Sequence, residues 1–218
     1  MTRIASNVTQ LLKAVPPHVT VLAAAKTQSA SMVMEAYQAG LRHFGHNYVQ
    51  EAFQMLPAVN AEIEWHMIGH LQRNKVKQAL DLFSFIDSLD SLRLADELEK
   101  QALVMKIIVP VMIEVNIGEE EAKTGVAPDV ALQLARSVSS LTHLQLVGIM
   151  TMGPRFGDSE DSRVYFKRTR AIFAAIQAMQ LPNVALKYLS MGMSSDYLVA
   201  IEEGANMIRL GTAIFGER

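Results

Sequence analysis

The chain has 218 residues, of which 50% are hydrophobic and 19% charged, so it can bury one substantial core as a single domain over residues 1–218. Its 20 basic and 22 acidic residues give a net charge of −2, which argues against nucleic acid or an anionic membrane as a partner. The absence of cysteine excludes disulfides, thiolate catalysis and Cys-ligated zinc.

The predicted elements alternate between strands and helices along the whole chain. A helix over 4–14 comes first, and helical periodicity is clearest afterwards at 31–39, 92–102, 130–138 and 164–179. The eight predicted strands cover 19–25, 41–45, 64–69, 83–88, 109–116, 146–152, 186–190 and 207–210.

This alternation predicts an α/β fold of the closed (β/α)8 TIM-barrel type, with an extra N-terminal helix. Eight strand–helix repeats without a linker or low-complexity tract suit a closed barrel better than an open doubly wound sheet. In such barrels the chemistry takes place at the carboxyl ends of the strands. The polar residues that end or follow the predicted strands are therefore the first candidates for a functional site.

The chain shows no targeting or membrane-spanning segment. No apolar signal segment follows the N-terminal residues, and the longest apolar run, 107–113, is interrupted by Pro110. That run is far shorter than the roughly 18 residues needed to cross a bilayer. We therefore expect a cytoplasmic protein.

Lys26 ends the apolar run 21–25, which is an unusual place for a lysine. Buried surroundings at the barrel mouth would disfavour the ammonium form and yield the free amine that carbonyl chemistry requires. The alternative is a lysine that reaches solvent where its strand ends.

The segment 190–196 is a candidate anion site. It ends a predicted strand, carries glycine and hydroxyl groups, and leads into a helix predicted from Tyr197, so backbone N–H groups would face the barrel mouth. Ser194, Ser195 and Asp196 could equally be ordinary helix caps. The loops after strands seven and eight form the usual phosphate site of this fold, which favours the anion site.

Arg209 lies on the last predicted strand and is followed by Gly211 and Thr212. If Ile208 and Leu210 face the helix layer, alternation along the strand turns Arg209 into the barrel. The alternative is an ion pair between Arg209 and one of three acidic residues, Glu202, Glu203 or Glu217.

Nine short segments carry the pattern of a known family. They are 24–27, 44–51, 65–75, 86–89, 115–117, 123–125, 148–152, 189–194 and 208–216. In this order and spacing they resemble the pyridoxal phosphate homeostasis protein family, also called the YggS or proline synthase co-transcribed family. The fold of that family is similar to the barrel domain of bacterial alanine racemase.

The resemblance implies that Lys26 binds pyridoxal 5'-phosphate as a Schiff base. It implies that the phosphate lies against Ser194, Gly211 and Thr212, next to a wall formed by Ser190, Met191 and Gly192. Residues that would line the cofactor ring are Asn47, His66 and Met150.

The resemblance also places Arg209 near the pyridine nitrogen of the cofactor. A guanidinium cannot accept a proton, so the ring nitrogen would stay unprotonated and the cofactor would be a weaker electron sink. This favours a protein that binds the cofactor over one that uses it in catalysis. The sequence departs from the family at His46, where glutamate is usual, and at Ala25 and Arg73, where serine is usual.

Three functions compete. The first is a non-catalytic protein of pyridoxal phosphate homeostasis that passes the cofactor to apoenzymes. The second is an amino-acid racemase, which needs an acid/base group on each face of the substrate. Racemases take the opposing tyrosine from a second domain, and none of the tyrosines here (Tyr37, Tyr48, Tyr165, Tyr188 and Tyr197) substitutes for it. The third is a Schiff-base aldolase, whose lysine usually comes later in the barrel. Without the second domain we expect a monomer.

Four histidines suggest a metal site, but the sequence does not support one. His43, His46, His66 and His70 fall on two predicted strands, and their spacing does not match a helical ligand pair. We therefore expect no metal. The segment 123–125, which follows the acidic run 119–121, could be a mobile loop over the barrel mouth or a solvated turn.

Overall fold

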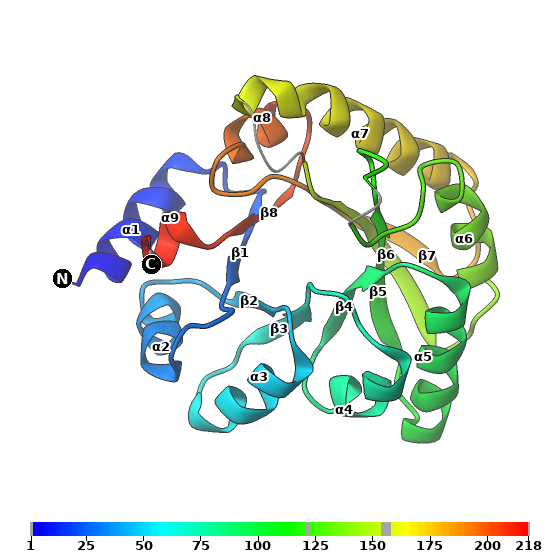
Figure 1. Ribbon diagram of the computed structural model, residues 1–218, viewed down its shortest axis with the longest axis horizontal. Helices are drawn as coiled ribbons and strands as arrows, with labels where there is room; N and C mark the ends of the chain where they lie inside the picture. Colours follow the sequence, from blue (N-terminus) through cyan, green and yellow to red (C-terminus); the bar gives the residue numbers. More distant parts are fainter. Residues whose placement is uncertain (1, 121–122, 154–157, 218) are drawn as a thin grey trace.

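The computed structural model describes residues 2–120, 123–153 and 158–217. Eight parallel strands form a closed barrel in sequence order, and β8 pairs with β1 (Figure 1). The strands are β1 (Thr20–Ala24), β2 (His43–His46), β3 (Glu64–Met67), β4 (Phe85–Leu89), β5 (Val109–Val115), β6 (Leu144–Thr151), β7 (Val184–Ser190) and β8 (Met207–Leu210). The predicted (β/α)8 barrel is confirmed.

Helices surround the barrel (Figure 1). They are α1 (Arg3–Ala14), α2 (Ala30–Gln38), α3 (Val49–Met55), α4 (Val76–Leu80), α5 (Leu92–Met105), α6 (Ala131–Val138), α7 (Arg163–Ala178), α8 (Tyr197–Glu202) and α9 (Thr212–Phe215). Short 3₁₀ turns cover Leu56–Ala58, Arg73–Lys75 and Ser159–Ser162. Within the described parts of the chain, no helix has the length and apolar character needed to cross a membrane.

Alternation along the strands divides the buried residues into two layers. On β8, Ile208 and Leu210 pack in the large core between strands and helices, whereas Met207 packs inside the barrel. The apolar residues of the interior are Leu22, Met112, Val147, Met150, Tyr188 and Met207. Polar side chains share this interior, and they form the site described below.

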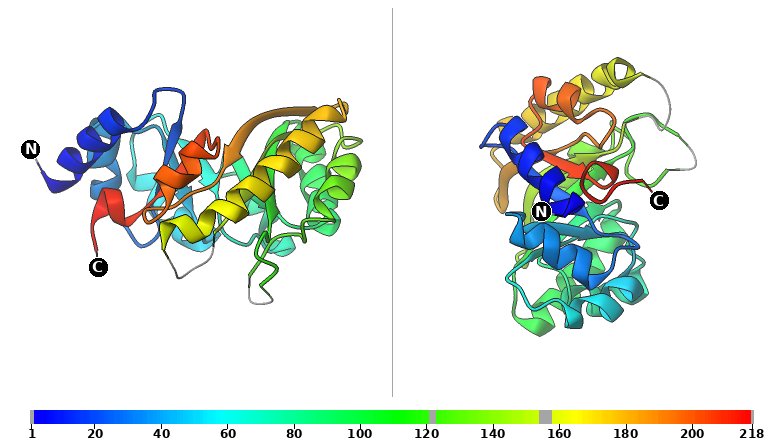
Figure 2. Two further views of the ribbon diagram at one scale, coloured as in Figure 1. Left: turned by 90° about the horizontal axis from the view of Figure 1, so that it is seen from above. Right: turned by 90° about the vertical axis from the view of Figure 1, so that its left-hand side faces the viewer.

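The predicted extra helix is α1. The Thr2 side chain caps it by accepting a hydrogen bond from the Ala5 N–H, and Ile4, Val8 and Leu11 form its buried face. Figures 1 and 2 show α1 beside α9, at the other end of the chain. The Asn7 side chain donates a hydrogen bond of 3.0 Å to the Ile214 carbonyl and so joins the two helices.

Candidate functional site

Lys26 and the turn at Gly211 lie next to each other at the mouth of the barrel, the opening at the carboxyl ends of the strands. Strands β1 and β8 run parallel, with Ala23 opposite Leu210. The segments that follow both strands therefore leave the barrel at the same place. A Cβ atom built on Gly211 would lie 3.8 Å from the Cβ of Ala24, two residues before Lys26.

Lys26 itself is exposed. The apolar run before it is buried as predicted, but the side chain reaches solvent beyond the strand end, which is the alternative that the sequence left open. Thr27, the next residue, has a φ of 62°, which turns the chain sharply after the lysine. Lys26 is thus presented at the mouth and not enclosed in it.

Ser194 joins the loop after β7 to the turn after β8. Its hydroxyl accepts hydrogen bonds from the backbone N–H of Gly211 at 3.3 Å and of Ala213 at 3.2 Å. Ser194 therefore caps α9, and not α8 as a local helix cap would. The juxtaposition of the two loops puts Ser194, Gly211 and the exposed Thr212 together at one side of the mouth.

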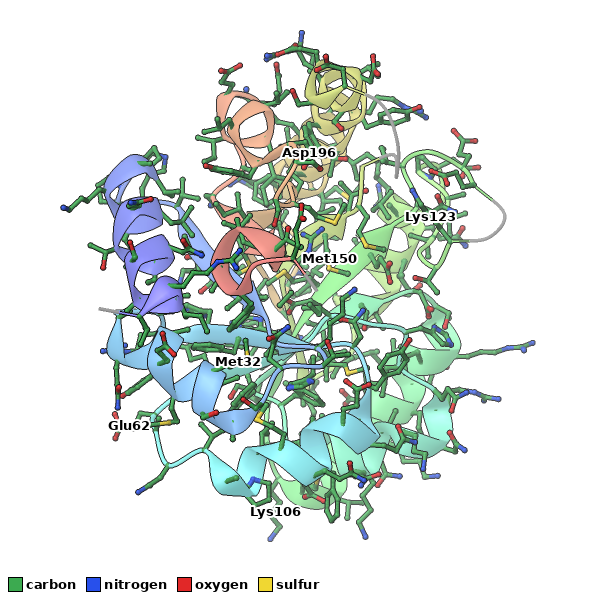
Figure 3. All side chains as sticks on the ribbon, turned by 60° about the vertical axis from the view of Figure 1, so that its left-hand side comes forward. Met32, Glu62, Lys106, Lys123, Met150 and Asp196 are labelled. Carbon is green, nitrogen blue, oxygen red and sulfur yellow. The ribbon has the colours of Figure 1, made fainter. Side chains whose placement is uncertain are left out.

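Asp196 holds this loop in place, a role that the sequence did not distinguish from helix capping. It is only 4% exposed, and its carboxylate accepts hydrogen bonds from the Met193 N–H at 2.7 Å and the Ser162 hydroxyl at 2.9 Å. Figure 3 shows Asp196 on the segment leading into α8, close to α7. The contact with Ser162 depends on residues far apart in the chain, so no local pattern reveals it.

Gly192 is required by the path of the same loop. Its φ is +93°, and an added Cβ would lie 2.6 Å from the Cβ of Ala200 and 3.0 Å from the Cα of Tyr197. We expect Gly192→Ala to destabilise the protein by at least about 2 kcal/mol, because it combines backbone strain with a clash against a helix. Urea unfolding measures this.

The matched control is Gly211→Ala. Gly211 has a φ of −115°, and a Cβ there would contact only Ala24, at ordinary distances. We expect its stability to stay within about 0.5 kcal/mol of the wild type. Equal losses in both variants would contradict the role given to Gly192.

Arg209 points into the barrel, as the alternation of β8 predicted. It is 5% exposed, and its guanidinium donates hydrogen bonds to the Ser190 hydroxyl at 2.8 Å and the Thr151 carbonyl at 2.6 Å. Burial lowers the pKa of Arg209, while three carboxylates act in the opposite direction, those of Asp87, Glu114 and Asp196.

Two of the three alternative partners considered for Arg209 are engaged elsewhere. Glu202 and Glu203 each lie 2.7 Å from the guanidinium of Arg163, where α8 ends and α7 begins. The structural ion pair between Arg209 and either of these two residues is therefore wrong. Ser190 is fully buried, and its hydroxyl accepts the hydrogen bond from Arg209.

The other expected site residues lie at different depths. Asn47 follows β2 and lines a pocket beside the mouth together with His70 and Lys75. Met150 is fully buried inside the barrel (Figure 3). Met191 instead packs in the outer core, so its side chain faces the helices and not the mouth.

His66 lies in the barrel interior and faces the amino-terminal end. Its ring stacks on Phe85 with centroids 4.3 Å apart. Its Nδ1 lies 2.9 Å from Asp87 Oδ2, and its Nε2 lies 3.1 Å from His43 Nδ1. Both ring nitrogens are thus engaged below the mouth, and His66 is not at a strand end as expected.

Glu114 is a second buried acid in the interior, 2% exposed. Its Oε1 accepts a hydrogen bond of 2.8 Å from Thr124, and its Oε2 has no partner among the residues that the structure places. Burial raises the pKa of Glu114 above its ordinary 4.5. The contact with Thr124, and that of Lys123 with the Gly153 carbonyl at 3.1 Å, tie this part of 119–125 to the barrel.

Because the pKa of Glu114 is raised on folding, the native state binds more protons than the unfolded state above pH about 4.5. The contribution of protonated Glu114 to the free energy of unfolding is complete below that pH and is lost as the pH rises through the pKa of Glu114 in the folded protein. We expect Glu114→Gln to reduce this decline in the free energy of unfolding. Urea titrations at a series of pH values measure it, and an unchanged pH dependence would contradict it.

Comparisons with known proteins agree with this geometry. The family model of the alanine racemase N-terminal domain matches residues 1–218. The pyridoxal phosphate homeostasis protein of Aquifex aeolicus (strain VF5) is 43% identical over 198 residues, covering 90% of this chain and 86% of the relative. That of Haemophilus influenzae is 37% identical over 203 residues, covering 92% and 85%. This chain belongs to the pyridoxal phosphate homeostasis protein family. The predicted family is confirmed.

Solved structures show the same relationship. PipY of Synechococcus elongatus PCC7942, solved with PLP bound, matches this family member with a TM-score of 0.89 and 34% identity, covering 98% of this chain and 100% of PipY. The structure of PipY without PLP gives 0.92 and 35%, with the same coverage. Alanine racemase of Clostridium difficile 630 has a TM-score of 0.84 at 12% identity, covering 99% of this chain and 56% of the racemase, and so shares the fold.

His46, where the resemblance leads us to expect a departure from the family pattern, is an unusual histidine. His46 ends β2, is 1% exposed, and neither of its ring nitrogens has a hydrogen-bond partner within the described ranges. Burial lowers the pKa of His46, against the opposite effect of nearby Glu51. The ring packs against Trp65, with centroids 5.7 Å apart, on the outer side of the barrel wall. His46 therefore lies outside the interior that contains Arg209.

Proposed function

We propose that this protein binds pyridoxal 5'-phosphate as a Schiff base on Lys26 and acts in the homeostasis of that cofactor without a catalytic reaction of its own. The observation that carries the proposal is the register of β1 and β8, which puts Lys26 beside the turn at Gly211 and Thr212. A lysine amine and a phosphate-binding turn at one opening are the two parts that the cofactor requires.

The residues at the mouth fit a phosphate group. A Cβ built on Gly211 would lie 3.8 Å from the nearest side-chain atom, the Cβ of Ala24, so the glycine leaves open space there. The Ser194 hydroxyl and the exposed Thr212 offer hydrogen-bond donors around that space, while the N–H groups of Gly211 and Ala213 donate to Ser194. Two further residues support this turn indirectly. Ser190 accepts a hydrogen bond from Arg209, and Gly192 allows the backbone path of the loop after β7.

The interior favours holding the cofactor over using it. Bound pyridoxal phosphate supplies an electron-withdrawing ring and a carbonyl carbon that an amine can attack. Arg209 fixes two of its donors on Ser190 and Thr151 and cannot accept a proton. Arg209 would therefore leave the ring nitrogen of a bound cofactor beside it unprotonated, which would weaken electron withdrawal. We assign the ring wall to Asn47 and Met150, and to His66 only through its interior position.

We further propose a monomeric, cytoplasmic protein with one domain over residues 1–218 that passes the cofactor to PLP-dependent apoenzymes. The closed barrel supports the single domain because it leaves no unpaired sheet edge. Light scattering at low micromolar concentration should give the mass of one chain. A stable dimer there would contradict the monomer.

Absorption spectroscopy and peptide mapping test the proposal. The purified protein should show the yellow band of a protonated Schiff base, and borohydride should fix a pyridoxyl group that mass spectrometry locates on Lys26. A protein that stays colourless with added pyridoxal phosphate would overturn the cofactor assignment. Amino-acid racemisation well above that of free pyridoxal phosphate would instead favour the racemase alternative.

A further inference from the structure

A cluster of three potential metal ligands lies at the opposite end of the barrel from Lys26. His43 is the first residue of β2, Glu64 is the first residue of β3, and His66 follows two residues later on the same strand. The parallel pairing of β2 with β3 places His43 opposite Glu64 and Gly45 opposite His66. One ligand atom from each of the three residues lies within 4.8 Å of the others.

The separations of these atoms suit a small divalent cation. His43 Nδ1 lies 3.1 Å from His66 Nε2 and 3.6 Å from Glu64 Oε2. Zinc bonds of about 2.0–2.1 Å in a tetrahedral arrangement put ligand atoms roughly 3.3 Å apart. The Glu64 side chain is 52% exposed, so its carboxylate can rotate to complete the set and an ion can enter from solvent.

Asp87 orients His66 toward the cluster. Asp87 and His66 are both fully buried, and Asp87 Oδ2 lies 2.9 Å from His66 Nδ1. A carboxylate accepts hydrogen bonds, so Nδ1 of His66 carries the proton and its Nε2 lone pair faces the cluster. There it accepts a hydrogen bond of 3.1 Å from the His43 Nδ1–H, which a bound cation would replace. A carboxylate behind a histidine is the usual outer support of a metal-ligating imidazole.

One positive charge opposes an ion at this place. Lys187 on β7 acts electrostatically on His43, and its ammonium lies 4.6 Å from the ring centre of Tyr188. Lys187 is exposed, so its flexible side chain can move away when a cation binds. Glu64 and Asp87 carry the charges that would compensate the ion.

We propose that His43, Glu64 and His66 form a binding site for a zinc-like divalent cation, with Asp87 as a positioning residue and a fourth position open to water. The site links the starts of β2 and β3 at the end of the barrel opposite the mouth, and it shares His66 with the wall proposed for the cofactor ring. It departs from the expectation of no metal, which rested on the placement of the histidines on two strands and on helical spacing, and not on how those strands pair.

Competition titrations test the site. Tag-free protein, stripped of metal and equally loaded with pyridoxal phosphate in every variant, is titrated with zinc against a chromophoric chelator. Equal loading is needed because the free cofactor itself chelates divalent cations. We expect one zinc ion per chain in the wild type and an affinity more than about 100-fold lower in Glu64→Gln, which loses a ligand at an exposed position.

Glu62→Gln is the matched control, because Glu62 is an exposed glutamate two residues earlier and lies at the periphery in Figure 3. It should bind zinc like the wild type. Lys187→Gln should bind more tightly, since a like charge is removed. His43→Ala should lose zinc binding. Equal affinity in the wild type, Glu62→Gln and Glu64→Gln would show an adventitious ion only, for example at exposed His18, and would overturn the site. Absence of zinc binding in the wild type would do the same.

Discussion

In Lys26→Ala we expect complete loss of the Schiff-base absorption band and of the borohydride-fixed pyridoxyl group. The turn proposed to bind the phosphate remains, so the variant should still bind the cofactor, but at least about tenfold more weakly. Because Lys26 is exposed and makes no hydrogen bond within the described structure, its free energy of unfolding should change by less than about 0.5 kcal/mol. Spectroscopy, dialysis and urea unfolding of the same preparation measure these three quantities.

Lys123→Ala is the control for this experiment. Lys123 belongs to the loop after β5, on the same side of the barrel as α9 (Figures 2 and 3), and its amine is engaged with Glu120 and the Gly153 carbonyl. It should keep the band. If Lys26→Ala keeps the band and Lys123→Ala loses it, the covalent anchor is not Lys26. An equal decrease in both would indicate non-specific lysine adducts.

The second large effect should come from Arg209→Leu, which we expect to lower the free energy of unfolding by about 3 kcal/mol. The substitution leaves the Ser190 hydroxyl and the Thr151 carbonyl without their donor in the interior. It also removes the positive charge that faces buried Asp87 and Glu114. Urea unfolding in the absence of cofactor measures this loss without any contribution from binding.

Arg209→Lys separates charge from geometry. Lysine keeps the positive charge but cannot reproduce the planar pair of donors. We therefore expect Arg209→Lys to lower the free energy of unfolding by about half as much as Arg209→Leu. If both substitutions leave stability unchanged, Arg209 is not a structural element of the interior. If lysine is as destabilising as leucine, the two hydrogen bonds and not the charge determine the effect.

The sequence predicted the barrel well because its strands are short apolar runs that differ clearly from the helices between them. The predicted ends were less accurate. β7 begins at Val184 and not at 186, and its first residues alternate between half-buried and exposed, so apolar content alone did not mark them. The shortest helices, such as α4 and α9, have too few residues to show a helical period.

Site residues were predictable where one strand determined their direction. Alternation along β8 was sufficient to predict that the Arg209 side chain points into the barrel. Contacts between strands were not predictable in the same way. The meeting of His43 with His66 depends on the register of β2 and β3, and the contact of Asp196 with Ser162 depends on how α7 packs. The position of Lys26 at the mouth was predicted correctly, but only the structure shows that its side chain reaches solvent beyond the strand end.

The pairing of β8 with β1 also has a consequence for synthesis of the protein. The lysine at position 26 leaves the ribosome early, whereas the turn at 211 and 212 is translated near the end of the chain. A nascent chain that has exposed only its first strands therefore has the proposed anchoring amine without the proposed phosphate turn. If both proposals hold, stable capture of the cofactor would require a finished barrel, and incomplete chains would not withdraw pyridoxal phosphate from the cell in this way.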